Sequence, residues 1–146
     1  DLVFTPRRKL LSSYQLRNSD NKVDNLSYVI KDNSKKVVGS IRFWNIMVDS
    51  HCSRGLLLGP LAVHPIYQSE GLGEKLVLNG IEKAHSDNWN WIVLVGDLDY
   101  YSKFGFSKNP TRGISIRNSL DNSRLLGLDI NDRFLEAAVG SLIEAS

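Results

Sequence analysis

The segment from residue 55 to residue 95 constrains the fold most, because it has the pattern strand, glycine turn, helix, strand. GLLLGPLAV (55–63) and WNWIVLV (89–95) are nearly all apolar, as expected of strands that are buried on both faces. Between them, apolar residues recur at helical spacing from Glu70 to His85. A crossover helix between two strands of one sheet makes those strands parallel. The sequence therefore predicts an α/β protein.

Two breaks in this segment point to a ligand. Gly59-Pro60 interrupts the first strand, which predicts a bulge or a splay at that point. Gly71 and Gly73 stand where the helix begins, and the unpaired amides and partial positive charge of a helix N-terminus attract phosphate. The alternative is a tight turn whose glycines only permit unusual backbone angles or close packing. Neither a dinucleotide fingerprint nor a P-loop fits, since Leu76 replaces the third glycine and no Gly-Lys-Ser/Thr follows.

Composition narrows the class of protein. A chain of 146 residues suits one domain, 1–146, and no run approaches the roughly 20 apolar residues of a membrane span. The net charge of +2 argues against nucleic-acid binding but allows a local basic patch that holds an anion. The single cysteine, Cys52, cannot form an internal disulfide, which fits a reducing compartment. We therefore expect a cytoplasmic protein that does not bind membranes and has no cysteine-rich zinc site.

The flanking segments complete a sheet of about six strands. Residues 26–31 and 36–48 are rich in β-branched and aromatic residues around the turn sequence DNS, which predicts an antiparallel hairpin. Residues 124–130 alternate enough to form a last strand, whereas 135–145 fit a short helix or a strand equally well. Residues 6–17 are predicted to form a short basic helix.

Two motifs resemble those of the GNAT superfamily of N-acetyltransferases. LAVHP (61–65) and QSEGLG (68–73), followed by Leu76, resemble its acyl-CoA-binding motif, whose core is Gln/Arg-x-x-Gly-x-Gly/Ala. YYSKFGF (100–106) resembles its second signature, Tyr-x-x-x-Gly-Phe. The likeness covers roughly residues 25–108 and fits best the bacterial branch with LGPLAV, VGD and YYxxFGF segments. The chain before residue 25 is shorter than the family expects, so we expect a single GNAT domain without its N-terminal strand and part of its first helix.

The resemblance implies the GNAT fold, a mixed twisted sheet that is splayed at the cofactor strand and has helices on both faces. It implies an N-acetyltransferase that moves an acetyl group from acetyl-CoA to a primary amine by direct attack in a ternary complex. The amine could belong to a small molecule, a protein N-terminus or a lysine side chain, and the oligomeric state stays open. A final hairpin that includes residues 124–130 would wall the acceptor pocket.

The cofactor-binding residues that the resemblance implies lie on one strand and one loop. The pantetheine arm would pair with the strand backbone, and the diphosphate would bind the loop amides beside Gln68. The full set is Leu61, Ala62, Val63, Gln68, Ser69, Glu70, Gly71, Leu72, Gly73 and Glu74. The amide of Leu61 would also polarise the thioester carbonyl, which makes Leu61 a catalytic position. No metal is expected.

Proton transfer is the less complete part of this prediction. Tyr101 matches the family's general acid, which would protonate the departing thiolate, although a tyrosine here could instead fill the core; Tyr100 is expected to be a packing residue. Several family members carry a carboxylate where this chain has LLL (56–58). The base could be water, Asp97 or Asp99, or the amine could already be neutral. Both aspartates are more simply explained as caps of a short helix.

Three further groups of residues have structural explanations. His51 and Cys52 are expected in a surface loop, since two adjacent ligands without a cluster seldom bind metal. His64 is expected to be a solvent-facing turn residue before Pro65 rather than a base. The tryptophans in strand-like runs are expected mainly in the core: Trp44, Trp89 and Trp91.

Two other functions compete with the transferase. A non-catalytic acyl-CoA sensor or interaction module would keep the phosphate loop and lack proton transfer, and the missing carboxylate favours that interpretation. A different nucleotide binder could use the same helix terminus. Tyr101 argues against the sensor, because it matches the position of the family's general acid.

Overall fold

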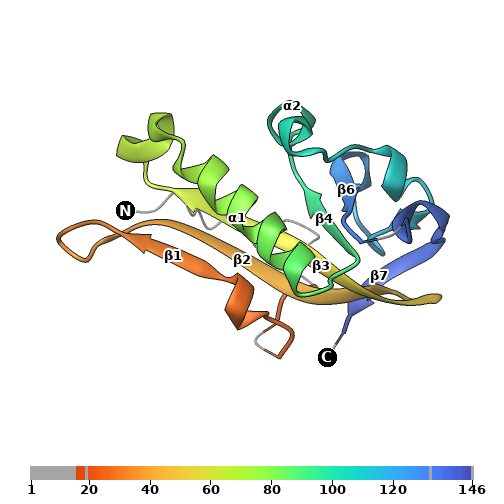
Figure 1. The fold of residues 1–146 in the computed structure, drawn as a ribbon. Coiled ribbons are helices and arrows are strands. Elements are labelled where there is room, and N and C mark those ends of the chain that lie inside the picture. Colours follow the sequence, from red (N-terminus) through yellow and green to blue (C-terminus); the bar gives the residue numbers. More distant parts are fainter. Residues whose placement is uncertain (1–15, 19, 132, 146) are drawn as a thin grey trace.

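A mixed sheet organises the chain (Figure 1). The computed structural model describes residues 16–18, 20–131 and 133–145. Within these residues the sheet has seven strands in the order β5-β7-β2-β3-β4-β6, and β1 pairs with β2 outside that path. The strands are β1 (Tyr28–Lys31), β2 (Val37–Val48), β3 (His51–Val63), β4 (Trp91–Val95), β5 (Ile114–Ser115), β6 (Leu125–Asp129) and β7 (Gly140–Glu144). The α-helices are α1 (Leu72–Ser86) and α2 (Leu98–Tyr101).

Short 3-10 helices connect these elements. They are η3 (Asp24–Leu26), η4 (Pro65–Glu70), η5 (Ser102–Phe104), η6 (Asn109–Thr111), η7 (Asn122–Arg124) and η8 (Leu135–Ala137). The sequence predicted one helix from Glu70, but α1 begins at Leu72 because Gly71 adopts a left-handed conformation between η4 and α1. The predicted helix over residues 6–17 lies almost entirely outside the described residues. None of the described helices is long and apolar enough to cross a membrane.

The predicted hairpin of β1 and β2 is confirmed. The two strands pair antiparallel, with Tyr28 opposite Ile41. Asp32 organises the turn, since its carboxylate accepts hydrogen bonds from the amides of Ser34 at 2.8 Å and Lys36 at 3.0 Å. An aspartate that accepts from the amide two residues later is a common turn-forming arrangement. The hairpin projects from the rest of the sheet at one end (Figure 1).

The predicted bulge in β3 is also confirmed. Leu61 pairs with Ile41 and Leu58 with Phe43, so Gly59-Pro60 occupies a single partner position on β2. Such an extra residue bends its strand and disrupts the ladder locally. Gly59 has a φ of 144°, a value that side chains strongly disfavour.

The start of β3 corrects one prediction. His51 and Cys52 were expected in a surface loop, but both belong to β3. His51 pairs with Val48 across a tight connection, and Val48 is fully buried. The register shifts between Ile46 and Val48, so residues 52–54 stand opposite the single position Met47, and the strand regains a partner at His51 beside the turn.

Strands β3 and β4 run parallel and then separate, as predicted. The pairs are Gly55 with Trp91, Leu56 with Ile92 and Leu57 with Val93. Beyond them β3 continues to Val63 without a partner on β4, whereas β4 continues to Val95 paired only with β6. The sheet is thus splayed on the carboxyl side of these two parallel strands, a usual place for ligands in α/β folds.

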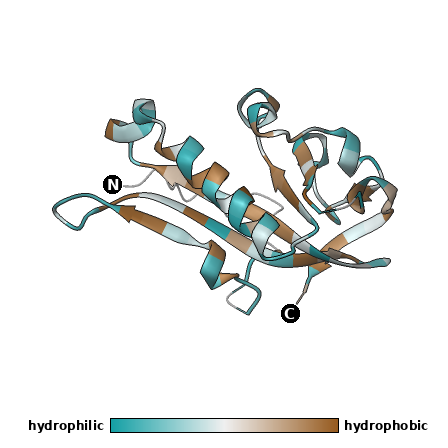
Figure 2. Cartoon of the chain, in the orientation of Figure 1, coloured by the Kyte–Doolittle hydropathy of each residue, from teal (hydrophilic) through white to brown (hydrophobic). Residues whose placement is uncertain are grey.

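Two hydrophobic clusters lie on opposite faces of the sheet. Helix α1 covers one face through its buried residues Leu76, Val77 and Ala84, which join Phe43, Leu56 and Ile92. The other face carries Trp44, Leu57, Trp91 and Leu142, covered in part by Leu135 of η8. Figure 2 shows hydrophobic residues along the central strands and hydrophilic residues at the β1–β2 turn. Among the described helices, α1 and Tyr101 of α2 pack against the first cluster and the three-residue η8 contributes to the second. All three tryptophans are buried.

The C-terminal strands correct a second prediction. The predicted segment 124–130 contains β6 (Leu125–Asp129) as expected, but β6 is not the last strand and makes no hairpin with β7. β6 pairs with β4 at one side of the sheet, and β7 pairs with β2 and β5 at the other. The carboxylate of Asp129 accepts from the amide of Leu135 at 2.9 Å, which turns the chain across the second face, and Leu135 is fully buried there.

Candidate functional site

A cavity of about 720 Å³ lies where the splayed end of β3 meets the start of α1. Eight residues predicted from the sequence line it: Leu61, Val63, Gln68, Ser69, Glu70, Gly71, Gly73 and Glu74. Two do not: Ala62 is buried, and Leu72 packs against the core beneath α1. Alternation along β3 explains Ala62, since neighbouring side chains on a strand point to opposite faces. The structure therefore brings most of the predicted binding residues to one cavity.

The turn before α1 is shaped by glycine. Gly71 has a φ of 76°, which only glycine adopts at little cost, and a Cβ at this position would have no atom within 4 Å. Gly71 thus permits an unusual backbone angle, as the tight-turn interpretation of the sequence expected. It also leaves open space where a side chain would stand. Among the described residues, no side chain at the N-cap position accepts from the first-turn amides of α1, because that position is Gly71. Gly73 and Glu74 of this turn line the cavity.

Gln68 fixes the loop to the splayed strand. Its side-chain amide donates a hydrogen bond to the carbonyl of Val63 at 3.2 Å. The loop and the strand edge are therefore held together, and an elongated ligand could contact both.

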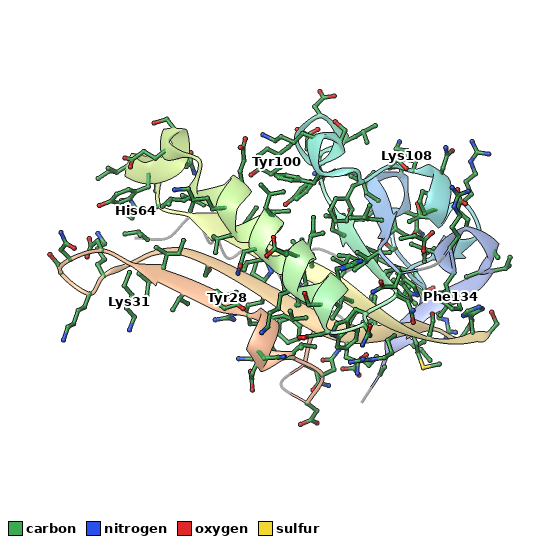
Figure 3. All side chains as sticks on the ribbon, in the orientation of Figure 1. Tyr28, Lys31, His64, Tyr100, Lys108 and Phe134 are labelled. Atoms are coloured by element: carbon green, nitrogen blue, oxygen red, sulfur yellow. The ribbon has the colours of Figure 1, made fainter. Side chains whose placement is uncertain are left out.

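Gly73 permits a close approach of a side chain from α2. A Cβ at Gly73 would lie 2.8 Å from the Tyr100 hydroxyl oxygen, closer than such atoms approach in proteins. Figure 3 shows Tyr100 extending from α2 toward α1. The second glycine is thus required by packing in this conformation. Tyr100, which the sequence assigned to packing, lines the cavity.

Lys103 is the second cavity residue that the sequence prediction missed. Its ammonium lies 2.7 Å from a Glu74 carboxylate oxygen and 4.4 Å from the centre of the Tyr100 ring. Residues three apart in a helical turn share a face, so once Tyr100 is placed the spacing Tyr100-x-x-Lys103 could have identified Lys103.

The indole of Trp44 holds the bulge. Its Nε1 donates a hydrogen bond to the carbonyl of Gly59 at 2.5 Å, and Trp44 is buried. This bond connects β2 to the residue at which β3 leaves its regular register. No sequence signal separated this role from ordinary core packing.

Tyr101 lies below the cavity rather than along it. Its ring packs edge-on against Phe106 at 5.9 Å and against Tyr100 at 4.9 Å, and it closely approaches Gly96. Burial raises the pKa of Tyr101 to about 12, with a smaller contribution from Tyr100. The phenol therefore stays protonated at physiological pH. Burial also raises the pKa of Tyr100, while the Lys103 ammonium opposes that rise.

The candidate bases have other roles in the structure. Asp97 caps α2, since its carboxylate accepts from the amide of Asp99 at 3.1 Å, and Asp99 is exposed. His64 was expected to face solvent, but only 8% of its surface is exposed. It caps η4 through Nδ1, which accepts from Ile66, and burial lowers the pKa of His64. The apolar side chains of residues 56–58 are buried.

Within residues 16–18, 20–131 and 133–145, no group of three or more His, Cys, Asp or Glu residues could hold a metal ion.

Comparison with known proteins shows what the chain is similar to. The family model described as "Acetyltransferase (GNAT) domain" matches residues 24–108. The uncharacterized N-acetyltransferase YhbS of Escherichia coli is 31% identical over 81 residues, which cover 56% of this chain and 48% of YhbS. The uncharacterized N-acetyltransferase YjhQ of Escherichia coli is 34% identical over 73 residues, 49% of this chain and 40% of YjhQ. The chain matches about half the length of these curated relatives or less.

Solved structures share the fold. A crystal structure of YhbS from Escherichia coli in complex with CoA superposes with a TM-score of 0.73 at 20% identity, covering 99% of this chain and 88% of that one. A GNAT family acetyltransferase from Brucella melitensis in complex with acetyl-CoA gives 0.67 at 23% identity, covering 99% and 80%. The family match spans both signature motifs and the cavity residues. The chain therefore belongs to the GNAT acetyltransferase domain family.

Proposed function

We propose that the protein is an N-acetyltransferase that moves an acetyl group from acetyl-CoA to a primary amine by direct attack in a ternary complex. The observation that carries the proposal is the continuity of one cavity from the unpaired edge of β3 to the uncapped first turn of α1. An extended arm can pair with the strand edge while its diphosphate receives helix amides.

The residues present fit coenzyme A. The cavity volume lies within the usual range for cofactor sites, about 300–1,000 Å³. Gly71 leaves its surroundings open, and the Gln68 amide ties the loop to Val63. We assign the strand edge at residues 61–63 to the pantetheine arm and the amides of residues 69–73 to the diphosphate. Glu74 follows these amides in the first turn of α1.

The bound thioester supplies an activated acyl group. The chain's own residues position it and move protons. The amide of Leu61 is proposed to donate a hydrogen bond to the carbonyl oxygen as that oxygen gains negative charge. Tyr101 is proposed to give its proton to the leaving thiolate. It is protonated at physiological pH, and burial makes it a weaker acid than an ordinary tyrosine. Tyr100, whose hydroxyl lies at the first turn of α1, is assigned to the phosphate end.

The acceptor is proposed to be an amine of a small molecule or of a protein. Two structural neighbours, YhbS from Escherichia coli and the acetyltransferase from Brucella melitensis, are in complex with CoA and with acetyl-CoA, which supports the choice of cofactor. With Asp97 engaged as a cap and apolar residues at 56–58, amine deprotonation is assigned to water or to an acceptor that is already neutral.

One assay tests the proposal. Free thiol release from acetyl-CoA is followed across a library of amines, with thermal shift by acetyl-CoA, ATP and NAD as a binding control. A ligand that binds only the folded state raises the melting temperature. We expect acetyl-CoA alone to stabilise the protein and at least one amine to release thiol. Stabilisation by ATP or NAD but not acetyl-CoA would contradict the proposal.

A non-catalytic acyl-CoA sensor is the second candidate. The apolar residues 56–58 favour it, because they offer no base beside the strand edge. A sensor would be stabilised by acetyl-CoA and would release no thiol with any amine.

A further inference from the structure

The cavity contains a charge arrangement that the phosphate assignment does not explain. Two carboxylates, Glu70 and Glu74, line it, and Lys103 is the one Lys or Arg among its described lining residues. Glu74 stands in the first turn of α1, where a bound diphosphate would receive backbone amides. A carboxylate there is favoured by the helix dipole, and it would repel a phosphate placed at the same amides.

The pairing of Glu74 with Lys103 connects two separate elements across the cavity. The ammonium lies 2.7 Å from the carboxylate, and the two side chains come from α1 and η5. Their side chains are 50% and 45% exposed, respectively. An ion pair this exposed contributes little to stability, so exchange of its partner has a small cost.

Lys103 is held in place independently of Glu74. Its ammonium lies 4.4 Å from the Tyr100 ring centre and 5.6 Å from that of Phe104, within the range of cation–π attraction. The Tyr100 hydroxyl in turn lies against Gly73. The cation therefore stays at the cavity edge when its carboxylate partner changes.

We propose that Glu74 is an internal counter-ion that occupies Lys103 until a phosphate group enters the cavity, and that Lys103 then contacts that phosphate as a binding residue. This inference rests on the proposed function, because it needs a phosphate-bearing ligand at the first turn of α1. It predicts that the two members of one ion pair affect binding in opposite directions. Glu74 opposes phosphate binding, and Lys103 supports it.

The test measures the Kd for CoA and for pantetheine, which lacks the diphosphate, by calorimetry at low and moderate salt. In Glu74→Gln the Kd for CoA should fall about threefold, and in Lys103→Gln it should rise about fivefold, the range expected for exposed charge contacts. Both variants should bind pantetheine like the wild type, and the salt dependence for CoA should weaken in Lys103→Gln. Glu82→Gln and Lys83→Gln serve as matched controls, because both residues are exposed on α1 and line no part of the cavity.

The outcomes separate this inference from the proposed function. Wild-type protein that binds neither CoA nor acetyl-CoA overturns the proposed function and this inference with it. Wild-type protein that binds CoA, together with Kd shifts of the same sign in Glu74→Gln and Lys103→Gln, or no shift in either, overturns the ion-pair exchange alone. Melting temperatures of all four variants check that each is folded. A common loss of melting temperature in the two pair variants, without opposite Kd shifts, identifies a purely structural clasp and also overturns the exchange.

Discussion

The Trp44 indole donates a 2.5 Å hydrogen bond to the Gly59 carbonyl, linking β2 to the bulge at which β3 leaves its regular pairing. The splay that follows is the opening between β3 and β4, so this bond orients the strand edge of the candidate site. Both the indole donor and the hydrogen bond are buried, so water cannot readily replace the indole as the partner of the Gly59 carbonyl. Trp44 therefore combines a core position with a role in shaping the cavity.

Trp44→Phe should separate these two roles. The substitution keeps an aromatic ring and removes the donor, which leaves the Gly59 carbonyl without its indole partner. We expect a loss of about 1–3 kcal/mol in the free energy of unfolding, measured by urea denaturation. The Kd for CoA should also rise, because the strand edge is less fixed. Trp89→Phe is the control, since Trp89 is buried and its ring contacts Arg54, whereas the Gly59 carbonyl accepts from Trp44. An equal effect on CoA binding in both variants would contradict the assignment.

The two loop glycines should respond differently to alanine. At Gly71 the cost is conformational, about 1–2 kcal/mol for the positive φ, and no neighbour is displaced. At Gly73 the added Cβ meets the Tyr100 hydroxyl 2.8 Å away. Adding Tyr100→Phe should therefore restore stability to Gly73→Ala and leave Gly71→Ala unchanged.

Thermal unfolding measures the stability of the two double mutants, Gly73→Ala with Tyr100→Phe and Gly71→Ala with Tyr100→Phe. A coupling energy near zero between Gly73→Ala and Tyr100→Phe would show that the hydroxyl is not what excludes a side chain at Gly73. CoA binding should remain weakened in the stabilised double mutant, since the new methyl group still covers the first-turn amides.

Substitutions of Tyr100 and Tyr101 should affect different quantities, the Kd for CoA and kcat respectively. Tyr101→Phe removes the proposed acid and should lower kcat about 100-fold with the Kd for CoA unchanged. Tyr100→Phe removes a hydroxyl at the first turn of α1 and should raise the Kd for CoA with a smaller effect on kcat. Stopped-flow turnover and calorimetry measure the two quantities. The reverse division would assign the acid role to Tyr100, which lines the cavity.

The sequence predicted the elements whose signal is local. The apolar runs, the helical spacing after Gly71 and the Gly59-Pro60 break indicated the parallel strands, α1 and the bulge, since each depends on nearby residues. The partner of β7 could not be predicted, because sheet order across β2 depends on packing of distant residues such as Leu135. The burial of His64 was missed for the same reason.

At the candidate site, motif residues were easier to find than the groups that complete it. The glycine loop and the Leu61 strand carry a spacing that a sequence displays directly. Lys103 and Tyr100 reach the cavity from an element that follows another strand, so only the fold brings them beside Glu74. Trp44 lies in an apolar, strand-like run that predicts a core position. Its hydrogen bond to Gly59 depends on the geometry of the bulge.

Packing between β3 and β4 gives a prediction that is independent of function. A Cβ at Gly55 would collide with the indole of Trp91, which is fully buried. Gly55→Ala should therefore destabilise the fold by about 1–3 kcal/mol through overpacking. Trp91→Phe in the Gly55→Ala background should recover part of that loss, measured by urea denaturation. Additive losses in the double mutant would place the strain elsewhere.

Tyr101 should make stability fall at alkaline pH. Its pKa rises from the ordinary tyrosine value of 10.0 to about 12 in the folded protein, because burial disfavours the phenolate. Below pH 10 both folded and unfolded chains keep the proton, so the full contribution is present. As the pH rises from 10 to 12 the unfolded chain loses its proton first, and the free energy of unfolding should fall by up to about 3 kcal/mol. Urea denaturation from pH 9 to pH 12 should show this slope in the wild type and a shallower one in Tyr101→Phe. Equal slopes in the wild type and Tyr101→Phe would mean that the Tyr101 hydroxyl is solvated in the folded state.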